Sequence, residues 1–134
     1  MNQTTNLHLP QFEATDRIHH DDFNDAFQTL DAMPRISFGT YTGDGEAEQL
    51  ISLGFTPKAV LVFRCDGMTV SSGSNVYSFG GLALQGYPCE SYNDNPVAIV
   101  SIEENGFKVY NDNSSRWYAY TNESGTRFHY LAIA

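Results

Sequence analysis

The sequence of residues 97–133 is VAIVSIEENGFKVYNDNSSRWYAYTNESGTRFHYLAI, and its short apolar runs separated by turn residues decide the fold class. Val, Ile and aromatic side chains are enriched in strands, whereas clusters of Asn, Asp, Gly and Ser mark turns. Asn105-Gly106 readily takes the positive φ angles of a two-residue type I′ turn, so we predict a hairpin there. Both alternating faces of residues 127–133 are apolar, which predicts a strand that is central in its sheet or covered by a neighbouring protomer.

The same pattern extends back to residue 36, with no stretch of helical period. The predicted strands cover residues 36–42, 49–53, 59–65, 76–84, 97–103, 107–110, 116–121 and 127–133. Strands of this length and spacing indicate an antiparallel sandwich or barrel. We predict a mainly β fold over residues 36–134, an antiparallel β-sandwich of about six to eight strands, preceded by one short N-terminal α-helix.

The N-terminal segment differs from the rest because its apolar residues recur at helical spacing. The apolar stripe consists of Ile18, Phe23, Phe27 and Leu30. Pro34 cannot continue a helix, so we predict a helix over about 21–32. So short a helix is marginal alone in water and must dock its stripe. Residues 1–35 are therefore predicted to form an arm, extended over 1–15, and a docking or oligomerisation helix whose interface is the stripe.

The charge balance excludes some classes of partner. The 134 residues contain seven Lys and Arg against sixteen Asp and Glu, a net charge of −9. Phosphate neutralisation supplies most nucleic-acid affinity and much of the attraction to anionic lipid, so we expect no nucleic-acid partner and no membrane surface. No apolar run is as long as a bilayer span, and the first residues lack the basic and apolar parts of a signal peptide. We expect no membrane insertion, and synthesis in the cytoplasm without a signal peptide.

Residues suited to catalysis or metal binding are sparse. Cys65 and Cys89 have no zinc-site spacing, and the sequence leaves open whether they pair. The densest group of possible metal ligands is His19-His20-Asp21-Asp22, but adjacent helical residues point about 100° apart and cannot easily share one ion. No nucleophile motif or phosphate-binding glycine loop occurs. We therefore predict that the protein is not an enzyme and has no catalytic residues, metal or cofactor.

Aromatic side chains are interleaved with amide and carboxylate groups in the polar loops and late strands, where Tyr118 and Tyr120 also lie. Such a mixture suits sugar rings, which have an apolar C–H face and a rim of hydroxyls. The alternative is that these aromatics fill the core and cross-strand pairs, as in any sandwich. The candidate carbohydrate-binding residues are Tyr87, Tyr92, Asp94, Tyr110, Asp112 and Trp117.

Two stretches resemble a known family. LPQFEATDRI at residues 9–18, followed by DFNDAF at 22–27, resembles the N-terminal region of tail-tip, fibre-like proteins from phages and prophages of Gram-positive bacteria. GTYTGDG at 39–45 and ISLGFTPKAVLV at 51–62 are similar to the start of the C-terminal β-domains of those proteins. The segment GFTPKAV at 54–60 also resembles, more weakly, trimeric H-type lectin domains, which bind sugars near protomer interfaces.

The resemblance implies a receptor-binding protein at a phage tail fibre or baseplate tip. It implies a homotrimer, located in the virion tail, whose partners are other tail or baseplate proteins and a host cell-wall glycan. Two alternatives stay open: a purely structural tail subunit without a ligand, and a stand-alone lectin-like adhesive module.

Overall fold

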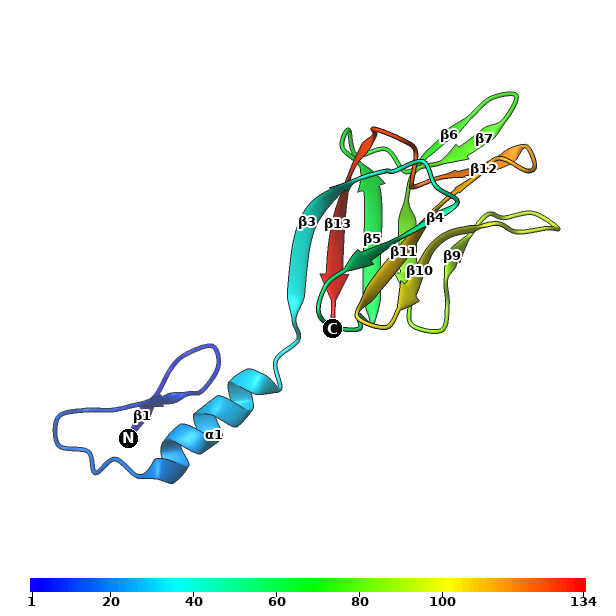
Figure 1. The fold of residues 1–134 in the computed structure, drawn as a ribbon. Coiled ribbons are helices and arrows are strands. Elements are labelled where there is room, and N and C mark those ends of the chain that lie inside the picture. The colour runs from blue at the N-terminus through cyan, green and yellow to red at the C-terminus, as the bar shows by residue number, and fades with distance from the viewer. The chain divides into compact units, whose positions relative to one another are not determined.

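The computed structural model describes residues 1–134, and the chain divides into two compact units, Met1–Pro34 and Arg35–Ala134 (Figure 1). Strands account for 46% of the residues and helix for 9%, in one helix and several sheets. The predicted fold class, a mainly β sandwich with one short N-terminal helix, is therefore confirmed. The helix is too short and too polar to cross a membrane.

The N-terminal unit combines one helix with a short strand pair. Helix α1 spans His20–Asp31, one residue from the predicted bounds, and the Asp22 carboxylate accepts a hydrogen bond from the His19 backbone N–H at 3.1 Å. The first fifteen residues are not simply extended, because β1 (Asn2–Gln3) and β2 (Pro10–Gln11) pair antiparallel. Phe12, which follows β2, packs on Phe23 of α1 with ring centroids 5.3 Å apart.

The β unit contains a four-stranded antiparallel sheet in the order β3-β13-β5-β8. Its strands are β3 (Ile36–Thr42), β13 (Arg127–Ile133), β5 (Ala59–Arg64) and β8 (Gly81–Leu84). The β13 strand lies between β3 and β5 and pairs with both. Its apolar residues on both faces thus belong to a central strand, one of the two positions that the sequence predicted.

The second sheet has the order β6-β7-β12-β11-β10-β9, with β4 also paired to β11. Its strands are β4 (Glu48–Ser52), β6 (Val70–Ser72), β7 (Val76–Ser78), β9 (Cys89–Glu90), β10 (Ala98–Glu103), β11 (Gly106–Asp112) and β12 (Trp117–Tyr120). The pairing of β7 with β12 is parallel, whereas the other pairs are antiparallel.

The core consists of side chains from both sheets. The buried apolar side chains of the four-stranded sheet are Tyr41, Val60, Val62, Ala83, Phe128 and Ala132, and those on β10, β11 and β12 are Ile99, Val100, Phe107, Val109 and Ala119. Tyr41 stacks on Phe128 at 5.2 Å, and Phe107 meets Tyr41 edge-on at 6.1 Å. Each buried Phe or Val contributes about 1.5–3 kcal/mol relative to an exposed one, so this layer holds the sandwich together.

One predicted strand is divided between the two sheets. Residues 76–84 form β7 and β8, which belong to different sheets, because the chain crosses over at Phe79-Gly80. A Cβ at Gly80 would overlap the Val62 carbonyl oxygen, so the crossing requires a residue without a side chain. The prediction of one continuous strand here was wrong.

The predicted hairpin joins β10 to β11, but its turn is shifted by one residue. Glu103 pairs with Gly106, so Glu104 and Asn105 are the two turn residues, and of these only Asn105 has a positive φ, 64°. Gly106 lies in β11, where a Cβ would overlap the Ile51 carbonyl oxygen of β4. The type I′ prediction was therefore wrong. Glycine is required at position 106 because β4 packs closely against β11 there, and not because the turn needs a positive φ.

Candidate functional site

The six candidate carbohydrate-binding residues lie in different parts of the β unit. Tyr87 is in the β8–β9 turn, Tyr92 and Asp94 are in the β9–β10 loop, Tyr110 and Asp112 are on β11, and Trp117 begins β12. Tyr92 and Asp94 line one hollow together. The other four residues do not line that hollow.

The hollow lies along the β9–β10 loop and has a volume of about 470 Å³. It is lined by Glu90, Ser91, Tyr92, Asn93, Asp94 and Pro96. The loop extends outward beyond β9 and β10 (Figure 1). The Tyr92 side chain is 94% exposed, so its ring is open to a ligand.

Hydrogen bonds around the buried Ser91 fix the conformation of this loop. The Ser91 hydroxyl accepts from the Val97 backbone N–H at 2.9 Å and donates to Asn93 Oδ1 at 2.6 Å. Asn93 Nδ2 donates to the Asn95 carbonyl at 3.0 Å. Because the neighbouring side chains hold the loop, a ligand that stacks on Tyr92 would not need to order it.

Two carboxylates of the hollow are available to a ligand. Glu90 and Asp94 are exposed, and neither makes a hydrogen bond or an ion pair within the chain. Ionised carboxylates accept hydrogen bonds from hydroxyl groups. The hollow therefore combines one exposed aromatic face with acceptors for hydroxyls.

Tyr87 is also exposed, by 75%, but its surroundings differ. It occupies a tight turn in which the Tyr87 N–H donates to the Leu84 carbonyl at 2.8 Å and the Leu84 N–H donates to the Tyr87 carbonyl at 2.9 Å. No side-chain hydrogen bond is made in residues 84–88. Tyr87 thus presents an isolated ring.

Tyr110 and Asp112 have partners within the fold. The Tyr110 hydroxyl is 2.7 Å from the Ser101 hydroxyl on the neighbouring β10. Asp112 Oδ1 accepts from the Ser114 N–H at 2.9 Å, and hydrogen bonds from Ser114 lower the pKa of Asp112. These contacts give both side chains structural roles in β11 and in the turn that follows it.

Trp117 is half-buried at the start of β12. Strand alternation places it on the same face as the fully buried Ala119. The Trp117 backbone N–H donates to the Ser115 hydroxyl at 3.1 Å, which fixes the entry to the strand. The indole is not among the partly buried side chains that pack against the core.

The structure also assembles an aromatic cluster that the sequence did not predict as a unit. Tyr77 of β7 lies 5.0 Å from Tyr118 and 5.3 Å from Tyr120 of β12, between ring centroids, and Phe79 extends the cluster. The Arg64 guanidinium lies 4.1 Å from the centre of the Phe79 ring. Alternation placed Tyr118 and Tyr120 on one face, but Tyr77 joins them through the parallel β7–β12 pairing, for which the sequence carries no local signal. The three Tyr rings are half-buried and Phe79 is buried, and their contacts stabilise this pairing.

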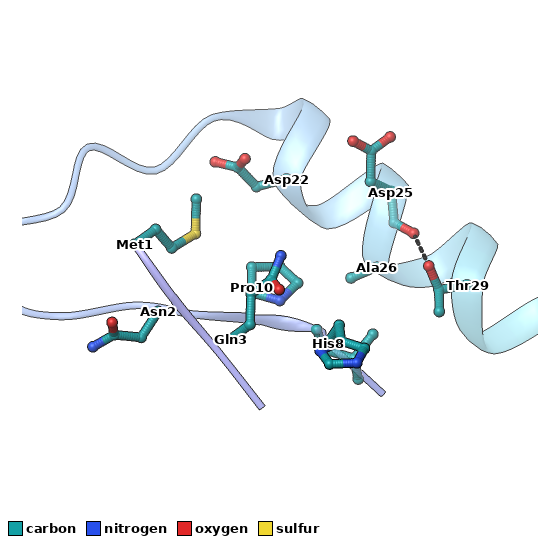
Figure 2. Close-up of a pocket in the computed structure, with 10 residues that line it drawn as sticks. Met1, Asn2, Gln3, His8, Pro10, Asp22, Asp25, Ala26 and Thr29 are labelled. Atoms are coloured by element: carbon teal, nitrogen blue, oxygen red, sulfur yellow. Dashed lines mark hydrogen bonds between the residues drawn. The ribbon is translucent and has the colours of Figure 1, made fainter. Parts of the chain in front are cut away.

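The N-terminal unit has a second pocket, between the β1–β2 strand pair and α1 (Figure 2). Its volume is about 190 Å³, and its polar lining includes His8, Asp22 and Asp25. Thr29, at its edge, donates to the Asp25 carbonyl at 2.9 Å. No cluster of three His, Cys, Asp or Glu side chains anywhere in the chain is placed to hold a metal ion, and Cys65 and Cys89 are both free thiols.

The helix stripe predicted as an oligomer interface remains open to solvent within its own unit. Ile18, Phe23, Phe27 and Leu30 are exposed by 43–63%, and no residue of α1 is buried. Phe23 and Phe27 lie 6.5 Å apart between ring centroids, next to Phe12. Phe12 covers part of Phe23, and each of the four stripe residues still exposes at least two fifths of its surface.

Two of the predicted sites thus have surface chemistry suited to binding. The β9–β10 hollow suits a ligand with hydroxyl groups, and the α1 stripe suits an apolar partner surface. The resemblance to phage tail proteins stays a prediction, and the role of both features rests on their own chemistry. No protein-family model, curated protein or solved structure matches the chain.

Proposed function

We propose that the chain is a tail appendage protein of a phage or prophage, at a fibre or baseplate tip, whose β unit binds a host cell-surface carbohydrate. The single observation that carries the binding role is the 94% exposed Tyr92 ring on a hollow of about 470 Å³. The resemblance of residues 9–27 to tail-tip proteins supports the location in the virion tail.

The chemistry of the hollow suits a sugar. The Tyr92 ring offers an apolar surface for the C–H face of a sugar ring, while Glu90, Asn93 and Asp94 offer acceptors for its hydroxyls. An open hollow desolvates few groups, so we expect a weak single site, with a Kd on the order of 0.1–1 mM. This role is binding without catalysis.

Assembly would compensate for weak single-site affinity. We propose a homotrimer in which the α1 stripe provides contacts between copies, with other tail or baseplate proteins as neighbours. Several copies on one particle raise the avidity without any new contact to the glycan. The exposed Phe27 and Leu30 support this role for α1, because apolar side chains exposed along one helix face favour a partner.

The test measures binding of the full chain to purified wall polysaccharide from Gram-positive bacteria. Stacking on an aromatic ring contributes about 1–1.5 kcal/mol, so Tyr92→Ala should weaken binding about fivefold to tenfold. Tyr87→Ala is the matched control because Tyr87 is also exposed but lies outside the hollow. It should change binding by less than about twofold.

Other outcomes separate the alternatives. Failure of the wild-type protein to bind any wall polysaccharide would favour a purely structural tail subunit. Binding that survives Tyr92→Ala but not Tyr87→Ala would place the site in the β8–β9 turn. If the protein binds wall polysaccharide but antibody labelling does not detect it on phage particles, it would be a stand-alone lectin-like module.

A further inference from the structure

The outer face of the four-stranded sheet, which points away from the core, is apolar across all four strands. Strand register aligns its apolar side chains in three rows, and a fourth row at one end of the face consists of Thr42 and Arg127. The three rows are Ile36, Ile133, Ala59 and Leu84; Phe38, Leu131, Leu61 and Leu82; and Thr40, His129 and Phe63. We call this surface the outer apolar face.

No element of the β unit covers this face. Phe38 on the edge strand β3 is 76% exposed, and Leu82 on the opposite edge strand β8 is 55% exposed. Ile36, Leu84 and Ile133 are also exposed. The exposure thus extends from one edge of the sheet to the other.

The size and composition of the face match the centre of a protein interface. Strands about 4.8 Å apart with a rise of about 3.3 Å per residue give it a footprint of about 380 Å². The largest apolar patch on a typical monomer is about 300–600 Å² and is often functional. A stable interface buries about 800 Å² per partner, with an apolar centre and a polar rim, so the face has the size of such a centre. The three rows contain no Asp, Glu, Lys or Arg, and the nearest charged side chain of these strands on the same face is Arg127, at the rim. Depletion of charge at the centre is typical of contacts between identical chains.

The charge of the chain also favours a second copy as the occupant. At a net charge of −9, two copies repel one another wherever their carboxylates approach. The outer apolar face has no carboxylate, so two copies can approach there with the least repulsion. Burial of its apolar area would contribute roughly 25 cal/mol per Å² to the free energy of association, before the entropic costs of association are subtracted.

The face carries a hollow as well as exposed side chains. A hollow of about 410 Å³ lies on it, lined by Phe38, Gly39, Thr40, Leu61, Phe63, His129, Tyr130 and Leu131. The Phe63 and His129 rings stack at 5.5 Å and form one wall. A surface that carries both a largely exposed ring, Phe38, and an apolar hollow can pair with a copy of itself.

We propose that the outer apolar face binds a second copy of this chain, with Phe38 of each copy packed into the hollow of its neighbour. This contact is distinct from the α1 stripe and does not depend on glycan binding. It would leave the β9–β10 hollow outside the contact, since none of the residues of that hollow lies on the outer apolar face.

The test compares the masses of full-length variants by sedimentation or light scattering at about 10–100 μM, a range in which micromolar contacts form. The wild-type mass should exceed that of one chain. Phe38→Glu should weaken association at least about tenfold, because each contact would then bury a carboxylate. Leu82→Glu makes the same change on the opposite edge strand. Both side chains are exposed, so the circular dichroism spectrum should not change.

Tyr92→Glu is the matched control, since it places the same charge at an exposed aromatic position outside the face. Its mass should equal that of the wild type. A wild-type chain that stays monomeric throughout this range overturns the proposal. The proposal is also overturned if Phe38→Glu and Leu82→Glu both leave the wild-type mass unchanged while Phe27→Asp lowers it. Self-association would then depend on α1 alone.

Discussion

Asn122 is a polar residue that the fold buries completely, two residues after the end of β12. Its amide Nδ2 donates to Asp44 Oδ1 at 2.6 Å and to the Glu46 carbonyl at 3.0 Å, and its Oδ1 accepts from the Asp44 N–H at 3.1 Å. The side chain therefore ties the segment between β3 and β4 to the end of β12.

Asn122→Ala should lower the free energy of unfolding by about 2–3 kcal/mol, because it removes three hydrogen bonds made by a fully buried side chain. Urea denaturation measures the change. Asn113→Ala is the control, since Asn113 is exposed and its side chain makes no hydrogen bond; it should change stability by less than about 0.5 kcal/mol. Equal effects of the two substitutions would contradict the structural role of Asn122.

The ion pair between Asp66 and Arg64 affects how the stability of the protein depends on pH. Hydrogen bonds from the Arg64 guanidinium, and one from the Met68 backbone N–H, lower the pKa of Asp66 from 3.8 to about 2. A lowered carboxyl pKa adds stability that is present above pH 3.8 and is lost as the pH falls towards 2.

Arg64→Gln should move the midpoint of the Asp66 carboxyl titration, followed by NMR, upward towards 3.8. Without the Arg64 guanidinium, the free energy of unfolding should also fall less steeply as the pH is lowered from 4 to 2. Arg116→Gln is the matched control, because Arg116 forms no ion pair. An Asp66 midpoint that is the same in wild type and Arg64→Gln would show that the guanidinium does not hold the carboxylate.

Individual site residues were only partly predictable from the sequence. Aromatic and Asn/Asp content pointed to the β9–β10 loop, where Tyr92 and Asp94 share a hollow. The same content also pointed to Tyr110, whose hydroxyl bonds to Ser101 across the sheet. Composition cannot separate these cases, because strand pairing and hydrogen bonds between distant residues decide which ring faces solvent.

At the scale of elements, the crossing at Gly80 links β7 in one sheet to β8 in the other. Gly80→Ala should destabilise the protein by about 1–3 kcal/mol or more, because the added methyl group would overlap the Val62 carbonyl and displace β5. Thermal or urea unfolding measures the loss.

Gly73→Ala provides the comparison, because a Cβ at Gly73 has open space and the backbone needs no positive φ. It should leave the free energy of unfolding within about 0.5 kcal/mol of the wild type. If Gly80→Ala proved as mild as Gly73→Ala, the close approach of Gly80 to Val62 would be refuted.

The strands themselves were largely predictable, since alternation and turn residues depend on local sequence. Residues 36–42 and 127–133 match β3 and β13 at both ends. The partner of each strand was not predictable. The parallel β7–β12 pair and the division of residues 76–84 both depend on contacts between distant segments, such as that of Gly80 with Val62.

At the scale of the whole molecule, we expect the α1 stripe to contribute to contacts between copies of the chain. Phe27→Asp should lower the assembly mass measured by light scattering, because a carboxylate would enter an apolar contact between copies. Gln28→Asp adds the same charge at the adjacent exposed position outside the stripe and should leave the mass unchanged. A mass insensitive to Phe27→Asp would exclude the stripe as a contact between copies.

The pairing of β3 with β13 has a consequence for how the chain acquires its structure. The two strands match along seven residue pairs, although they are the first and last strands of the β unit. During synthesis on a ribosome, β3 and β5 emerge well before the strand that joins them, so both wait with apolar side chains uncovered. Folding dominated by such distant pairings takes milliseconds to seconds. The nascent chain is therefore most vulnerable to aggregation and proteolysis just before residues 127–133 are released, and a chaperone that shields β3 and β5 in that interval should raise the yield of folded protein.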